Sequence, residues 1–165
     1  MDNNSAIGVI FTGVKPKEEE EVTVQDFFDN VPTNNDWSIA EAYMCLLLEA
    51  VFADDVVVAA EEEYLRAMVK RSKTFAGLSD QELARLNMTV MERRSSRPDC
   101  VKEACKALPS SMHKTIFAHA IDIVLSDGEM HPRERDYLDN LMTTMELPQD
   151  TAKNIMQVIF DKNRF

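Results

Sequence analysis

Two segments of the chain resemble each other in the same register, and this repeat constrains the fold more than any other feature. Residues 49–54 (EAVFAD) align with residues 122–127 (DIVLSD). Beyond a short loop, the same alignment pairs Glu61, Tyr64, Leu65 and Met68 with Glu134, Tyr137, Leu138 and Leu141. Each copy reads as an apolar helix that ends at an acidic residue, a loop, and a second helix with a glutamate in its first turn. The repeat therefore predicts a duplicated helix–acidic loop–helix unit.

Helix signals also occur outside the repeat. Ser38 and Glu41, like Ser79 and Glu82, have the spacing of a capping box. The chain has only 4 glycines and 6 prolines, which is few for a protein of short strands and turns. We predict an all-α fold, with a single compact helical domain of about seven helices over residues 37–165. The helices are expected at about 39–53, 60–75, 80–94, 98–108, 111–126, 132–145 and from 148 onward, with the first and fifth apolar and buried.

The first 36 residues differ from the rest of the chain. They are polar, and residues 18–21 are four consecutive glutamates. Apolar residues cluster at 7–11 and 22–28, where either short strands or a single helical turn would fit. We expect residues 1–36 to form an N-terminal arm packed on the helical body, with Phe27 and Phe28 as its anchors.

The charge and the lack of long apolar runs exclude several classes of partner. The chain has 18 Lys+Arg against 29 Asp+Glu, a net charge of −11, so we predict no nucleic-acid partner. No run of about 18 apolar residues occurs, which predicts no direct membrane insertion. The first residues (MDNNS) lack the basic start and apolar stretch of a secretory signal. The three cysteines, Cys45, Cys100 and Cys105, fit no disulfide framework, so we predict reduced thiols in a cytoplasmic protein.

The second acidic loop carries a resemblance to a known family. Residues 127–135 (DGEMHPRER) resemble the Asp-Gly-Glu…Glu signature of the tellurite-resistance TerB-like family, and residues 53–61 resemble its other acidic loop in a degraded form. The likeness covers about residues 38–162. The family also includes the N-terminal region of a membrane-anchored DnaJ-type co-chaperone. The resemblance implies a stress-response interaction module with clustered acids that bind a metal or a protein partner, where the partner is a membrane or co-chaperone component. It implies no particular oligomeric state.

The acidic loops could hold a divalent cation. Asp127, Glu129 and Glu134 lie on one bend, and carboxylates about 4 Å apart repel by roughly 1 kcal/mol even in water. Calcium or magnesium would relieve that repulsion, because both ions take oxygen ligands. The spacing is not that of an EF-hand. In the first copy Asp54 and Glu61 form a weaker candidate site, because the counterpart of Glu129 is a valine.

The same residues also admit an explanation without any ligand. Gly128 suits a helix C-terminus, and Pro132 suits the first position of a helix. Glu134 would interact favourably with the positive N-terminal end of its helix. Arg133 and Arg135 flank Glu134 and can balance its charge. In this alternative the protein is a structural or scaffolding helical domain that binds a protein partner without metal.

Two further acids lie inside the apolar helices. Glu49 and Asp122 occupy equivalent positions of the repeat, each before a loop acid. A buried carboxylate is costly unless it is paired. We expect each to form a salt bridge to another helix, and the competing hypothesis is a ligand or supporting role beneath the acidic loop. His119 is a candidate partner for Asp122 because it precedes it by one helical turn.

Motifs for catalysis are missing from the sequence. It contains no His-Glu-x-x-His zinc motif, no pair of Glu-x-x-His motifs, no glycine-rich phosphate loop and no nucleophile elbow. We therefore predict that the protein is not an enzyme. The opposing hypothesis is a small metal-dependent hydrolase that uses His119 or His131 together with an acid.

Overall fold

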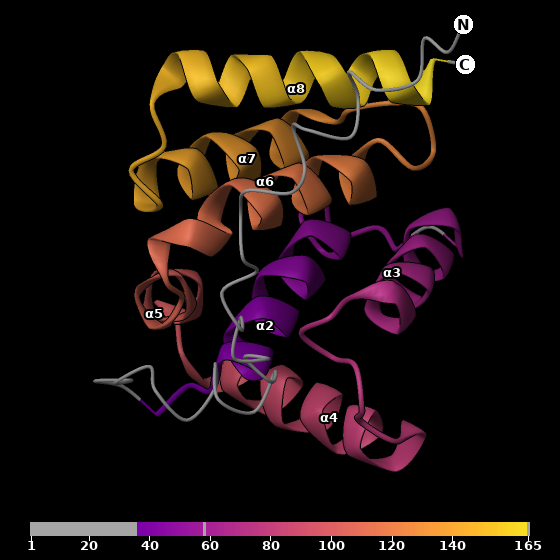
Figure 1. The fold of residues 1–165 in the computed structure, drawn as a ribbon, viewed down its shortest axis with the longest axis vertical. Coiled ribbons are helices and arrows are strands. Elements are labelled where there is room, and N and C mark those ends of the chain that lie inside the picture. Colours follow the sequence, from indigo (N-terminus) through magenta and orange to yellow (C-terminus); the bar gives the residue numbers. More distant parts are fainter. Residues whose placement is uncertain (1–35, 58, 165) are drawn as a thin grey trace, which may run out of the picture. The chain divides into compact units, whose positions relative to one another are not determined.

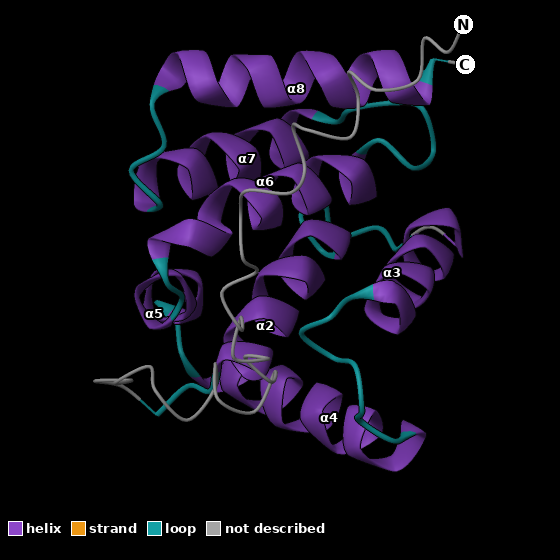
Figure 2. Ribbon diagram, in the orientation of Figure 1, coloured by secondary structure: helices purple, strands orange, loops and turns teal. Residues whose placement is uncertain are grey.

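Seven helices make up the part of the chain that the structure describes, residues 36–57 and 59–164 of a computed structural model. No strand occurs in these ranges, and Figures 1 and 2 show the helices and their connections. The helices are α2 (Ile39–Val51), α3 (Ala59–Arg71), α4 (Asp80–Ser96), α5 (Cys100–Ala107), α6 (Ser110–Val124), α7 (Pro132–Thr144) and α8 (Gln149–Asn163). The predicted all-α domain of about seven helices is confirmed. Of the residues described, none forms a helix long and apolar enough to cross a membrane.

The two most apolar helices form the centre of the domain. Ten of the thirteen residues of α2 are buried, and α2 contacts α3, α4, α5, α6 and α7. α6 contacts α2, α3, α7 and α8 and buries a continuous run from Ala120 to Val124. Both helices had been predicted to be buried, because a helix that is apolar on nearly every face has no side suited to water.

Two helix starts confirm the capping boxes read from the sequence. The Ser38 hydroxyl accepts a hydrogen bond from the Glu41 amide at 3.2 Å, and the Glu41 carboxylate accepts one from the Ser38 amide at 2.8 Å. Ser79 and Glu82 exchange the same pair of bonds at 3.3 and 2.7 Å. These bonds satisfy backbone amides that have no partner within the helix.

The second helix is shorter than predicted. We had expected it to reach Phe75, but α3 ends at Arg71 and residues 73–77 form turns. The Ser72 hydroxyl accepts a hydrogen bond from the Thr74 amide at 3.2 Å, a local bond that competes with helix continuation. The turn places the Phe75 ring against the Tyr43 ring of α2, with centroids 5.4 Å apart. The apolar Phe75 therefore belongs to the core but not to the helix.

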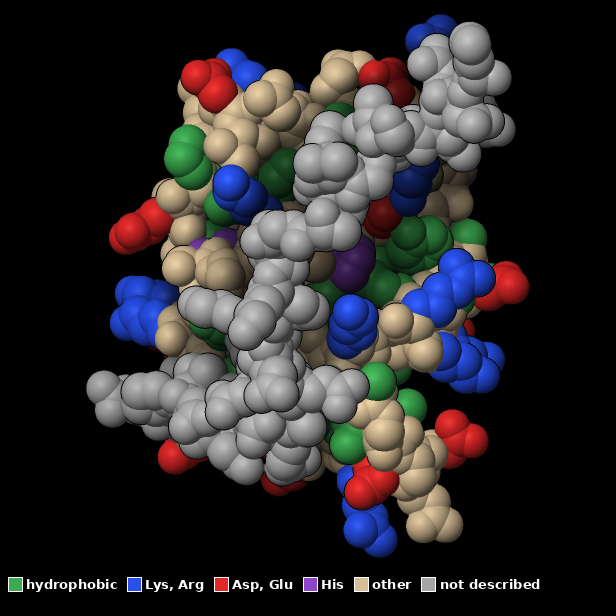
Figure 3. Space-filling view, viewed as in Figure 1, with side chains coloured by type: hydrophobic (Ala, Val, Ile, Leu, Met, Phe, Trp, Pro, Cys, Tyr) green, Lys and Arg blue, Asp and Glu red, His purple; other side chains and the backbone are tan. Residues whose placement is uncertain are grey.

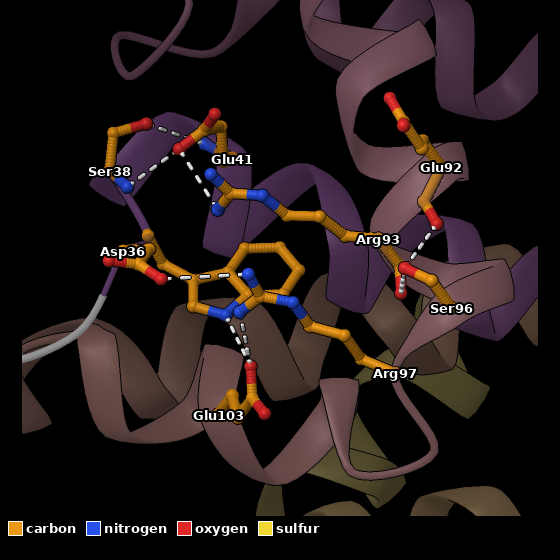
Figure 4. Close-up of polar contacts among 9 residues, drawn as sticks. Asp36, Ser38, Glu41, Glu92, Arg93, Ser96, Arg97 and Glu103 are labelled. Carbon is orange, nitrogen blue, oxygen red and sulfur yellow. Dashed lines mark hydrogen bonds and ion pairs between the residues drawn. The ribbon is translucent and has the colours of Figure 1, made fainter.

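A polar network surrounds a buried tryptophan at the start of α2. Trp37 is 1% exposed, and its indole N–H donates to the Glu103 carboxylate of α5 at 3.0 Å. Arg93 of α4 lies over the indole ring, 4.8 Å from its centroid, and also pairs with Glu41 at 3.5 Å. Arg97 pairs with Glu103 at 2.9 Å (Figure 4). Trp37 thereby ties α2 to both α4 and α5.

The expected N-terminal arm falls almost wholly outside the described residues. The packing of residues 1–36, and the anchoring by Phe27 and Phe28, therefore stay predictions. Asp36 is the one described residue of that segment, and it pairs with Arg97 at 3.6 Å.

Candidate functional site

The first acidic corner connects α2 to α3. An Asp54 carboxylate oxygen accepts a hydrogen bond from the Val56 amide two residues later, at 2.9 Å. Asp55, between them, has a φ of 66°. Aspartate is one of the few residues that adopt this left-handed conformation readily, because its short side chain bonds locally to the backbone. The corner is therefore an aspartate-stabilised turn followed by a helix start.

The second acidic corner connects α6 to α7 and has the same local structure. An Asp127 carboxylate oxygen accepts from the Glu129 amide at 3.0 Å, and Gly128 has a φ of 88°. In the alignment of the two copies Asp127 corresponds to Asp54 and Gly128 to Asp55. Both corners thus use an aspartate to hold a turn whose next residue is left-handed.

Each corner is followed by a buried glutamate near a helix start. Glu61 and Glu134 are each 2% exposed, and with Asp122 they are the buried charged residues of the described chain. The Glu134 carboxylate accepts a hydrogen bond from the His131 amide at 2.6 Å, as a capping-box glutamate does. Glu134 therefore lies in the first turn of its helix, as the sequence predicted, and its carboxylate bonds to the amide that precedes the helix.

The two corners adjoin each other. Arg133 of the second corner forms an ion pair with Asp55 of the first. Burial raises the pKa of Glu134, the hydrogen bond from His131 opposes this, and the charges of Asp54 and Asp127 raise it further. Since a carboxylate of each corner acts on Glu134, the structure brings Asp54, Asp127 and Glu134 to one region.

The predicted site residues do not form a closed ligand shell. Glu129 is exposed, and it is its backbone amide that bonds within the corner. Throughout residues 36–57 and 59–164, just one set of three ligand atoms from His, Cys, Asp or Glu lies within 4.8 Å of one another. That set is Cys45, Glu49 and Cys100, and it contains none of the residues predicted for the acidic corners. The carboxylates of the corners are therefore near one another without being gathered around a common point.

The cysteine–glutamate set was missed at the level of sequence. Cys45 and Glu49 lie one turn apart on α2, whereas Cys100 begins α5. Each cysteine, taken alone, fits the pattern of a buried apolar position. No sequence signal joins Cys45 to Cys100, because their proximity depends on how α5 packs on α2.

The acids inside the two central helices pair as expected, each with a cation from another helix. Glu49 accepts from Arg94 of α4 at 2.6 Å, and Asp122 accepts from Lys162 of α8 at 2.5 Å. Asn163 donates a further bond to Asp122 at 3.2 Å. The salt-bridge interpretation of both acids is therefore confirmed. His119 is not the partner of Asp122, since its Nδ1 forms a hydrogen bond with the Tyr43 hydroxyl.

His119 makes stability depend on pH. Burial lowers the pKa of His119. The negative charge of Asp122 raises this pKa, and the positive charge of Lys162 lowers it further. A base with a lowered pKa in the folded state stabilises the fold above its unfolded pKa of about 6.5, and this contribution is lost as the pH falls below it. We expect His119→Gln to show a smaller drop in melting temperature than the unmodified protein between about pH 7.5 and 5.5. If circular dichroism showed the same drop in melting temperature for both proteins, this role of His119 would be refuted.

Fold and corners together define a class of protein: a small all-helical domain in which two acidic helix–loop–helix corners adjoin. The family model of the tellurite resistance protein TerB matches residues 40–157. This chain belongs to the TerB family. Neither the comparison with curated proteins nor that with solved structures gives a match. The relation to a DnaJ-type co-chaperone stays a prediction.

Proposed function

We propose that this chain is a non-catalytic, cytoplasmic module of a tellurite-type stress response, whose two acidic corners together bind a divalent cation such as calcium or magnesium. The observation that supports the proposal is that the charges of Asp54, from one corner, and Asp127, from the other, both raise the pKa of the buried Glu134. Three carboxylates in one region need a positive charge, and Arg133 is already paired with Asp55. A hard cation with oxygen ligands supplies that charge.

A duplication explains why two corners are present. The aspartate turns, the left-handed residues and the buried glutamates correspond position by position. The correspondence extends to Glu49 and Asp122, which each pair with a cation two helices further along the chain. We infer that the two halves are copies, each of which contributes part of the cation site.

The cation site is tested by Glu134→Gln, which removes the charge but keeps an oxygen that can accept from the His131 amide. The unmodified protein is expected to gain about 1.4 kcal/mol at a calcium or magnesium concentration ten times Kd, measured as a rise in melting temperature. Glu134→Gln is expected to show no rise. Without cation it should be at least as stable as the unmodified protein, because it no longer buries a carboxylate with a raised pKa.

Glu82→Gln is the matched control for that experiment. Glu82 occupies the same capping position of α4, but its side chain is exposed and lies at neither acidic corner. It should leave the response to cation intact. A melting temperature unmoved by calcium, magnesium and manganese in the unmodified protein would refute the cation site.

The second candidate function is that of a scaffolding domain, which binds a helical or apolar protein segment without metal. A groove of about 520 Å³ lies among α2, α3 and α4, and its apolar lining includes Met44, Leu48, Val69 and Met91. Met88 of α4 is also 72% exposed. Methionine-rich surfaces adapt to varied apolar partners. In this alternative Asp127→Asn lowers stability, because a neutral amide oxygen accepts the Glu129 hydrogen bond more weakly than a carboxylate does, and it changes no response to cation.

The remaining partner predictions follow from charge and family. The net charge of −11 supports the absence of a nucleic-acid partner. Acidic and basic side chains are interspersed on the described part of the face drawn in Figure 3. A protein partner, such as a membrane or co-chaperone component, is the kind of ligand that the family resemblance supports.

A further inference from the structure

A second candidate metal site lies inside the helical body, between α2 and α5. Cys45 and Glu49 are one helical turn apart and project from the same side of α2. Cys100 is the first residue of α5, which contacts α2. The two thiols are buried, with exposed fractions of 0% for Cys45 and 5% for Cys100. The three side chains come from two helices and meet at one point.

The distances within this set suit a tetrahedral ion. The three ligand atoms all lie within 4.8 Å of one another, and Cys100 Sγ is 3.5 Å from Glu49 Oε1. Zinc binds sulfur at about 2.3 Å and carboxylate oxygen at about 2.0–2.2 Å, which separates two such tetrahedral ligands by roughly 3.5–3.7 Å. In the metal-free structure the Cys100 thiol donates a hydrogen bond to Glu49 across this separation, and the same separation fits two ligands of one zinc ion.

The charges balance once an ion is present. Two thiolates and one carboxylate carry three negative charges, which a divalent ion reduces to one. Arg94 Nε lies 2.6 Å from Glu49 Oε1 and supplies the last positive charge. A residue that holds a ligand carboxylate in place is a usual feature of metal sites. The Glu49 and Arg94 side chains are 17% and 25% exposed, which leaves a route for an ion and for a water as fourth ligand.

The packing of cysteines as small apolar side chains explains this arrangement less well than a metal site does. Buried cysteines commonly act as small apolar residues, and Cys105, also on α5 and 3% exposed, fits that description. Cys100 instead faces another thiol and a carboxylate. A disulfide between Cys45 and Cys100 is the other chemistry the pair could support. A disulfide would leave Glu49 without a role in the pair, whereas a metal ion uses that carboxylate as a ligand.

We propose that Cys45, Glu49 and Cys100 form a buried site for zinc or a similar thiolate-binding divalent ion, with Arg94 orienting Glu49. Binding converts both thiols to thiolates and releases two protons to solvent, so the affinity rises with pH. The site is independent of the acidic corners, whose carboxylates favour calcium or magnesium.

Cobalt(II) titration of the reduced full-length chain tests the site, because thiolate ligands give cobalt an intense near-ultraviolet charge-transfer band. We expect such a band together with the visible bands of tetrahedral cobalt, and we expect equimolar zinc to displace them. Cys100→Ser should weaken the charge-transfer band to no more than that of the one remaining thiolate, and weaken zinc binding on the order of tenfold or more. Cys105→Ser is the matched control, and it should leave both unchanged.

Two further measurements separate this site from its alternatives. Glu134→Gln should bind cobalt as the unmodified protein does, because its change lies in the acidic corners. Zinc should also slow the reaction of Cys45 and Cys100 with a thiol reagent in mild denaturant, where the buried thiols become reachable, and should slow the reaction of Cys105 less. A reduced chain without a thiolate–cobalt band would overturn the proposal, as would a band of undiminished intensity in Cys100→Ser.

Discussion

Trp37→Ala is expected to lower the free energy of unfolding by about 3–5 kcal/mol, the usual cost of deleting a buried aromatic side chain. The indole is 1% exposed and lies where α2, α4 and α5 meet. Its loss leaves a cavity at that junction and removes one of the donors that bond to the Glu103 carboxylate, another being Arg97. Trp37 is the only tryptophan, so its removal also removes the tryptophan fluorescence signal. Chemical denaturation should therefore be followed by far-ultraviolet circular dichroism.

Trp37→Phe separates packing from polar contacts. Phenylalanine keeps an aromatic ring for the Arg93 guanidinium to lie over but cannot donate to Glu103. We expect it to cost less than half as much as Trp37→Ala, because most of the buried apolar volume is retained. If Trp37→Ala cost less than about 1 kcal/mol, the junction of α2, α4 and α5 would not be a structural centre of the domain.

Lys162→Met is expected to lower the free energy of unfolding by about 2–3 kcal/mol, because it leaves the Asp122 carboxylate without its cation. The Asp122 side chain is 7% exposed and Lys162 is 49% exposed, so the substitution removes a solvated charge but strands a buried one. Asn163 still donates to Asp122, which keeps the loss below that of a fully isolated charge. Urea denaturation at neutral pH measures the effect.

The double variant Asp122→Asn with Lys162→Met identifies the cause. If the stranded charge is responsible, the double variant should regain much of the stability that Lys162→Met loses. Arg66→Met, which removes an exposed cation from α3, is a control for loss of a positive charge and should change stability by less than about 0.5 kcal/mol. A double variant no more stable than Lys162→Met would show that the lysine acts through its packed stem and not through its charge.

Local patterns predicted the helices well, and the misses have local causes. The capping boxes at Ser38 and Ser79 act between residues three apart, so the sequence contains the whole interaction. The end of α3 was placed too late because Phe75 continued the apolar pattern. The Ser72 turn ended the helix, while Phe75 stayed in the core through its contact with Tyr43. Burial and helical structure are therefore separate properties of that residue.

The candidate sites were predictable only in part. The acidic corners were found because their residues lie within a few positions of one another. The influence of Asp54 on Glu134 and the pairing of Asp55 with Arg133 join residues from different corners, and the repeat alone does not predict them. The partners of Glu49 and Asp122 were expected only as some cation on another helix, and packing selected Arg94 and Lys162.

The sequence by itself determined the helical class, the positions of the helices, the acidic corners and the resemblance to the TerB family. All of these depend on periodicity and on hydrogen bonds that close within about one turn. Tertiary structure alone decided that the two corners adjoin and that Cys45, Glu49 and Cys100 converge. These contacts between distant residues depend on how whole helices pack. That packing is determined by many weak side-chain contacts together, so no short segment of sequence predicts it.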